Sequence, residues 1–104
     1  MVSLVYAYKN MPETDKKFLE DYLEKKVDRL TNLTQSFSGI ASRLMVRAEK
    51  FATKSAYKIE MQLHLDGQKL LAAEDDHTVI EAADLALDKL IIQLRKLVEK
   101  KHAK

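Results

Sequence analysis

The chain has 104 residues, of which 46% are hydrophobic and 33% are charged. This length suits one domain, residues 1–104, around a single core, and the composition excludes an intrinsically disordered chain. Cysteine is absent, which excludes disulfide and thiol chemistry and suits a reducing compartment. The apolar runs are too short for a membrane span or a secretory signal, so we expect a cytoplasmic protein without membrane contact.

The first third of the chain predicts a strand and then an amphipathic helix. Residues 2–9 are rich in valine, leucine and tyrosine, which favour strands. Pro12 and Thr14 mark a helix start, with Thr14 as the candidate N-cap. Apolar residues then recur at spacings of three and four, as one buried stripe requires. The stripe consists of Phe18, Leu19, Tyr22, Leu23, Val27, Leu30 and Leu33. The segment Ser36-Phe37-Ser38-Gly39 ends the helix.

Three strands are predicted next, over residues 40–48, 57–65 and 68–75, where apolar and polar residues alternate. In the first of them, one face carries Ile40, Leu44, Val46 and Ala48, and the opposite face carries Arg43, Met45 and Arg47. Asp66-Gly67 separates the other two strands. This dipeptide is a strong hairpin signal because both turn residues must tolerate positive φ.

The last element is a helix that opens with a capping box, Thr78-Val79-Ile80-Glu81. Its apolar positions continue at helical period to near Lys100, and they are Val79, Ala83, Ala86, Leu87, Leu90, Leu94 and Leu97. The order β-α-β-β-β-α predicts an α+β fold, a four-stranded mixed sheet with two helices packed on one face. A right-handed crossover makes the first two strands parallel neighbours, and Arg43, Arg47 and Lys58 lie on the wet face.

The net charge of +2 conceals two basic segments. Residues 43–58 hold five basic side chains against one carboxylate, and these are Arg43, Arg47, Lys50, Lys54 and Lys58. The second basic segment lies in the last helix. Its residues Lys89, Lys96 and Lys100 fall within roughly 40° of one another around the helix axis, while Arg95 falls among acidic residues. Lys25 and Arg29 likewise share one flank of the first helix. Stacked like charges repel unless a polyanion neutralises them, although solvated faces are the ordinary alternative.

No arrangement of side chains indicates catalysis or metal binding. His64, His77 and His102 lack the spacing of metal ligands, and His64 is interpreted as an ordinary surface residue on the wet face. Asp75-Asp76 falls before a helix, where the helix dipole favours acidic residues. With two glycines, the chain has no phosphate-cradling loop. We therefore expect no enzyme activity, no cofactor and no small-molecule substrate.

The final helix carries a family resemblance. Asp84-Leu85-Ala86-Leu87-Asp88-Lys89-Leu90, followed by Gln93-Leu94-Arg95-Lys96, resembles the closing helix of the ribosome hibernation promoting factor and ribosome-associated inhibitor A family. The hairpin at residues 59–74 and the helical segment at residues 22–27 are also similar to that family. The sequence departs from the family pattern at Ile80, where an aromatic residue is common, and at Ile91-Ile92, where a Glu-Arg pair is common. It resembles the short form, without the ribosome-pairing domain of longer members.

The resemblance implies a single ribosome-binding domain with the fold already predicted. It further implies binding to the small ribosomal subunit, in the channel between head and body, with steric blockage of messenger and transfer RNA. Carried over by position, Lys89 and Lys96 contact rRNA phosphates, with Arg95 as a further candidate. The sorted charges and the first basic segment add Lys100, Lys25, Arg29, Arg43, Arg47, Lys50, Lys54 and Lys58 as rRNA-binding candidates. We expect a monomer away from the ribosome.

Two other functions stay open from the sequence. A double-stranded RNA-binding module has the order α-β-β-β-α, lacks the leading strand and reads RNA shape and phosphates. A protein-interaction domain could instead use Ile91 and Ile92 as an apolar patch, unless this pair packs against the sheet edge. An RNA-recognition motif is disfavoured because the outward sheet positions lack stacking aromatic residues.

Overall fold

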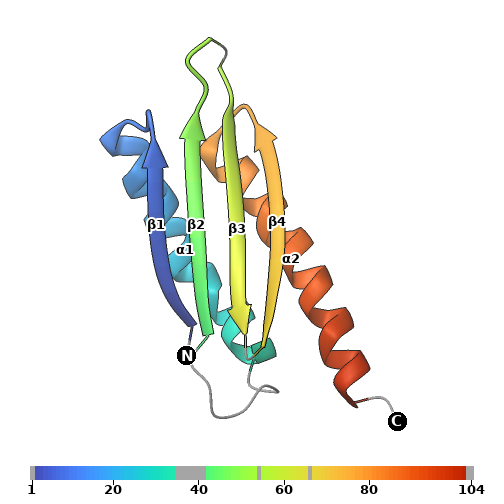
Figure 1. Ribbon diagram of the computed structural model, residues 1–104. Helices are drawn as coiled ribbons and strands as arrows, with labels where there is room; N and C mark the ends of the chain where they lie inside the picture. Colours follow the sequence, from blue (N-terminus) through green and yellow to red (C-terminus); the bar gives the residue numbers. More distant parts are fainter. Residues whose placement is uncertain (1, 35–41, 54, 66, 103–104) are drawn as a thin grey trace.

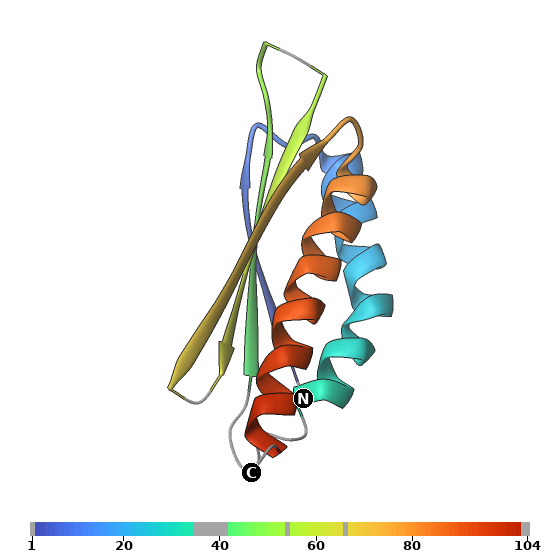
Figure 2. The ribbon, with the colours of Figure 1, turned by 90° about the vertical axis from the view of Figure 1, so that its right-hand side faces the viewer.

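The computed structural model describes residues 2–34, 42–53, 55–65 and 67–102. The elements, in chain order, are β1 (Val2–Lys9), α1 (Glu13–Thr34), β2 (Ser42–Lys50), β3 (Tyr57–Leu65), β4 (Gln68–Asp76) and α2 (Val79–His102). The strands form one sheet in the order β1-β2-β3-β4, and both helices cover the same face (Figures 1 and 2). β1 and β2 are parallel, and the remaining neighbours are antiparallel. The predicted α+β fold is confirmed.

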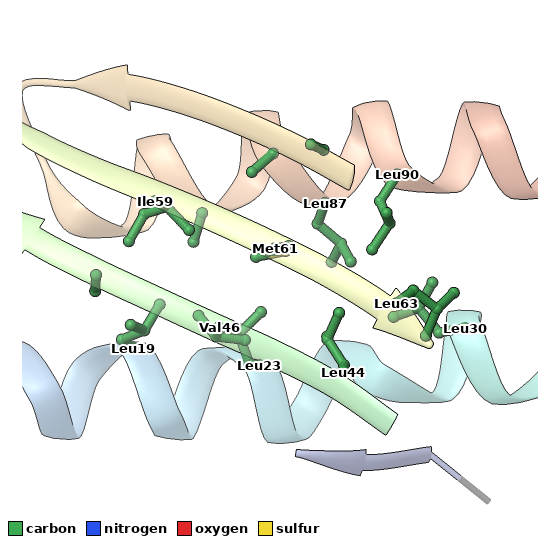
Figure 3. Close-up of a cluster of buried hydrophobic side chains, with 14 of the residues drawn as sticks. Leu19, Leu23, Leu30, Leu44, Val46, Ile59, Met61, Leu63, Leu87 and Leu90 are labelled. Carbon is green, nitrogen blue, oxygen red and sulfur yellow. The ribbon is translucent and has the colours of Figure 1, made fainter. Parts of the chain in front are cut away.

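The core lies between the sheet and the two helices (Figure 3). Alternate residues of each strand point toward the helices, so Leu44 and Val46 of β2 are buried while Arg43 and Arg47 are exposed. The helices contribute leucines that are almost fully buried, Leu19, Leu23 and Leu30 from α1 and Leu87, Leu90 and Leu94 from α2. The predicted faces of β2 are confirmed, except that Ile40 lies outside the described residues.

The start of α1 differs from the prediction. The backbone N–H of Lys16 donates to the carbonyl of Pro12 at 3.1 Å, so Pro12 holds the N-cap position. Thr14 lies inside the first turn, and its assignment as the N-cap was wrong. Glu13 and Asp15 favour this start because their carboxylates face the positive end of the helix dipole.

Phe18 does not belong to the buried stripe of α1, because 57% of its surface is exposed. It is rotated by about 100° from Leu19, which points straight into the core. Spacings of three and four fit both residues, so period alone could not separate them. Leu33 was also predicted to belong to this stripe, and its side chain lies outside the described part of the structure.

The turns around β4 follow the predicted chemistry in part. Gly67 has a φ of 70°, as the hairpin requires, whereas Asp66 lies outside the described residues. At α2, the Glu81 N–H donates to Thr78 Oγ1 at 3.1 Å, which is half of the capping box. The Glu81 carboxyl instead lies beside Asp76, and a hydrogen bond between the two carboxyl groups, followed by the negative charge of Asp76, raises the pKa of Glu81. The backbone N–H of His77 donates to Asp76 at 2.6 Å and lowers the pKa of that carboxyl.

Tyrosine hydroxyls tie the layers together. Tyr8 of β1 donates to Glu20 of α1, and Tyr22 of α1 donates to Asp84 of α2. Consistent with the second bond, α1 and α2 run side by side in the same direction (Figure 2). Burial, followed by the acceptor carboxylates, raises the pKa of both tyrosines, and burial raises that of Tyr6 to about 12. Over its described residues, neither helix combines the length and apolar character needed to cross a membrane.

A matched pair of substitutions tests the burial pattern of α2. Ile91 is 2% exposed and its neighbour Ile92 is 52% exposed. Ile91→Ala should lower the free energy of unfolding by roughly 2–5 kcal/mol, because it leaves a cavity in the core. Ile92→Ala should change it by less than about 0.5 kcal/mol. Urea denaturation of both variants measures the difference, and equal losses would contradict the assigned faces.

The tyrosine pKa values predict a loss of stability at alkaline pH. The pKa of tyrosine is near 10 in the unfolded chain, whereas burial raises the pKa of Tyr6 to about 12 in the folded chain. The stabilising contribution is therefore complete below the unfolded value and is lost as pH rises through the folded value. Tyr22→Phe removes one such group, so its melting temperature should fall less than that of the wild type between about pH 8 and about pH 11. An identical fall in both proteins would refute the contribution of Tyr22.

Candidate nucleic-acid interface

The two flanks of α2 face different neighbours, and this explains why its charges are sorted. The flank bearing Lys89 lies along β4, where its ammonium pairs with Glu74. On the same side, Gln93 Nε2 donates to the carbonyl of Leu71 at 2.6 Å. The acidic flank faces α1, where Asp84 accepts from Tyr22 and Asp88 lies 3.7 Å from Arg29. Part of the sorting therefore serves helix packing, without any nucleic acid.

Lys89, the first of the predicted phosphate contacts, is matched by a carboxylate. Its side chain is half exposed and its partner Glu74 is mostly buried. An ion pair at such a surface is worth about 0–1 kcal/mol, so a phosphate group could compete with it. Lys89 thus stays a candidate contact, but the free protein already neutralises its charge.

The lysine flank of α2, defined as Lys89, Lys96 and Lys100, is unneutralised over its C-terminal part. Lys96 and Lys100 are exposed and form no ion pair with any residue that the structure describes. Four residues, a rise of about 6 Å along the helix axis, separate them, which is close to the spacing of successive phosphates along an RNA strand. Arg95 is exposed on the acidic flank, also without an ion pair to a described residue.

The candidates on α1 divide in the same way. Arg29 faces Asp88 across the helix pair, so it has a structural role in joining the helices. Lys25 is exposed and has no ion-pair partner among the described residues. Lys26 lies with its ammonium 5.8 Å from the ring centre of Tyr22, which keeps its charged end at the surface.

The basic residues of the first segment lie on the sheet. Arg43 and Lys58 are exposed on the open face and make no ion pair in the described part of the chain. Arg47 lies 3.6 Å from Glu60 of β3, and the ammonium of Lys50 lies 5.8 Å from the Tyr57 ring centre. Lys54 lies outside the described residues. Because side chains alternate along β2, Lys50 lies on the helix side of the sheet with Ala48. The described candidate contacts therefore occupy two separate surfaces, the helix side of the molecule and the open sheet face.

Sequence reasoning missed a neighbour relation on the open face. His64 of β3 stands directly opposite Arg43 of β2 and Lys69 of β4. Its Nε2 is buried without a hydrogen-bond partner, so it is not the ordinary surface histidine that was expected. The pairing with Lys69 could have been found by counting outward from a two-residue Asp66-Gly67 turn.

The described residues contain no group of three histidine and carboxylate side chains that could hold a metal ion. The hollow among Val5, Met45 and Gln62 on the open face has a volume of about 30 Å³. This hollow has room for a water molecule only. Two wider and more open hollows lie elsewhere, one of about 510 Å³ beside Asp76 and His77 and one of about 330 Å³ beside Glu49 and Lys58.

Comparisons with known proteins agree with the architecture. Two solved structures share the fold, namely the Protein Y N-terminal domain of Thermus thermophilus and a ribosomal subunit interface protein of Coxiella burnetii. The first has a TM-score of 0.69 at 24% identity and covers 91% of this chain and 98% of that one. The second has a TM-score of 0.68 at 18% identity, with coverage of 93% and 97%.

Relatives are also found by sequence. A ribosome hibernation promoting factor of Azotobacter vinelandii is 37% identical over 82 residues, covering 79% of this chain and 71% of the relative. A ribosome hibernation promotion factor of Picosynechococcus is 28% identical over 86 residues, covering 83% of this chain. The match spans only 45% of the length of that second relative. Residues 5–102, nearly the whole chain, match the family described as sigma 54 modulation protein / S30EA ribosomal protein, and the chain belongs to this family.

Proposed function

We propose that the protein docks on the small ribosomal subunit and holds the ribosome idle. It occupies the channel between head and body, where messenger and transfer RNA would otherwise lie, and it inhibits translation by steric exclusion. It acts in the cytoplasm as one ribosome-binding domain, residues 1–104, and is a monomer away from the ribosome. Neither catalysis nor a cofactor is needed for this action.

The unneutralised part of the lysine flank carries the proposal. Lys96 and Lys100 project from a rigid helix whose opposite side is fixed in the core by Leu90 and Leu94. RNA phosphates would relieve the repulsion between these ammonium groups, which no described carboxylate does. Family membership and the names of the relatives support a ribosomal partner for the protein.

The shape of the molecule suits steric exclusion. Its extents are 49 × 21 × 20 Å, so it is a rod rather than a sphere. Two long helices packed along a twisted sheet make that rod stiff (Figures 1 and 2). A stiff body loses little conformational entropy on binding, so a modest number of phosphate contacts can hold it in place.

Reversal of the unneutralised lysines tests the binding surface. Lys96→Glu combined with Lys100→Glu should lower co-sedimentation with purified small ribosomal subunits by at least about tenfold, since each lost contact to a charged group is worth about 1.5–3 kcal/mol. Both positions are exposed, so the thermal unfolding curve should stay near that of the wild type.

The matched control is Lys9→Glu combined with Lys17→Glu, which changes the net charge equally at exposed positions. Lys9 ends β1 and Lys17 lies on α1, both away from the lysine flank. This control should bind nearly as the wild type does. Similar weakening in both double variants would mean that net charge, rather than the assigned surface, governs binding.

The salt dependence of binding separates phosphate contact from apolar docking through Ile92. This residue is exposed, while Ile91 belongs to the core, so the pair cannot form the apolar patch considered from the sequence. Phosphate contact predicts that log K falls with log salt concentration, by roughly 0.7–0.9 per phosphate neutralised. The double variant at Lys96 and Lys100 should reduce this slope by about 2. A flat salt profile for the wild type would favour apolar docking.

A further inference from the structure

The open face of the sheet carries a second basic cluster, far from the contacts between the helices. We define the basic row as Arg43, His64 and Lys69, from β2, β3 and β4. The strand register places Arg43 opposite His64, and His64 opposite Lys69. Directly opposite residues share a face, with Cβ atoms about 5 Å apart. Three nitrogen-bearing side chains therefore stand in line across the sheet.

No described carboxylate neutralises this row. Arg43 and Lys69 are exposed and form no ion pair with a described residue. The next positions along the same face are uncharged, at Met45, Gln62 and Leu71. The nearest described carboxylate on this face of β3 is Glu60, four residues and about 13 Å along the strand from His64. It lies 3.6 Å from the guanidinium of Arg47.

The other end of the same face shows how a sheet neutralises its own charges. There Lys9, Glu49, Lys58 and Asp75 stand opposite one another in strand order, so the sign alternates at every step. Lys9 lies 3.9 Å from Glu49 in that row. The basic row lacks such alternation, because Arg43 and Lys69 carry the same sign on either side of His64. An anion lying over His64 would be attracted by both charges.

His64 adds a second observation. Its Nε2 is buried and has no hydrogen-bond partner, which leaves a polar atom unsatisfied in the free protein. The neighbouring strands present only Ser3, Arg43 and Lys69 to this row, and the helices lie on the opposite face. A proton gained by His64 would add a third positive charge, which a bound anion would stabilise.

We propose that the basic row is a phosphate-binding site for RNA, and that protonation of His64 strengthens it. This inference rests on the proposed ribosome binding and assigns a second surface to it. The row lies at the β3–β4 hairpin end of the sheet, the end toward which α2 carries Lys96 and Lys100 (Figures 1 and 2). Basic side chains thus lie on both sides of β4, so RNA can contact the protein around this edge.

Proton linkage provides the test. The dissociation constant for purified small ribosomal subunits is measured at about pH 6 and about pH 8, at constant salt concentration, for each variant. Wild-type binding should be tighter at the lower pH by about tenfold, because an additional positive charge beside the phosphate strengthens the attraction. His64→Gln should abolish this difference, and His64→Asn provides a second neutral replacement should glutamine disturb the strand.

Arg43→Gln combined with Lys69→Gln should weaken binding by at least about tenfold at both pH values, since it removes two charged contacts at exposed positions. Lys9→Gln combined with Lys17→Gln is the charge-matched control, and His77→Gln controls for titration elsewhere. Both controls should keep the wild-type affinity and its pH dependence. If the His64 variants also keep that pH dependence while binding normally, the basic row is refuted and the lysine flank still stands. If the wild type does not bind at either pH, the proposed function itself fails.

The chemistry of the partner is tested by cross-linking. A photoreactive residue placed at Lys69, in the otherwise unchanged chain bound to small subunits, should form adducts with rRNA. Adducts only with a ribosomal protein would overturn the assignment to RNA phosphate and favour an acidic protein surface. Complete absence of adducts, with binding intact, would place this face away from the ribosome and equally overturn it.

Discussion

Burial of one apolar face of the sheet beneath two helices is the constraint on which the rest of the molecule depends. Alternation along β2 and β3 sends Leu44, Val46 and Met61 inward, and it necessarily sends the intervening polar residues to the opposite face. The same burial fixes the rotation of α2 about its axis through Leu90. The positions of the lysine flank and of the basic row are therefore consequences of core packing, and neither surface can rotate away independently.

Within that frame, local neighbours decide which charges are free. On the acidic flank of α2, Asp84 accepts a hydrogen bond from Tyr22 of α1 and Asp88 forms an ion pair with Arg29 of α1. Lys89 forms an ion pair with Glu74. Such exposed pairs are weak, about 0–1 kcal/mol each, so they organise the surface without adding much stability. The free protein thus has a graded positive surface, which is neutralised at Lys89 midway along α2 and unneutralised toward the end of that helix. A polyanion would meet the unneutralised end at the lowest energetic cost.

The sequence predicted the fold well because the spacing of apolar residues, which indicates a helix or a strand, can be read within each short segment. The bounds of β1 and β3 matched, and the division of β2 into two faces held at each described position from Arg43 to Ala48. Errors arose where two residues fit one period equally well. Phe18 and Leu19 both suit the stripe of α1, and only packing shows which of them is buried.

The candidate site was less predictable because it depends on contacts between elements. Nothing in the order of residues links Lys89 with Glu74 or Arg29 with Asp88 before the helices are placed. The neighbours of His64 likewise require the strand register. The rRNA-binding residues therefore stay predictions, now sorted by whether the folded chain already neutralises them.

The Gln93 side chain has a consequence beyond holding α2 to the sheet. β4 is an edge strand, and an exposed edge invites another chain to extend the sheet by backbone pairing. By donating to the carbonyl of Leu71, Gln93 occupies one of the acceptors that such an incoming strand would need. By occupying this acceptor, α2 disfavours backbone pairing between β4 and a strand of another copy, and hence fibril formation when many copies accumulate unbound.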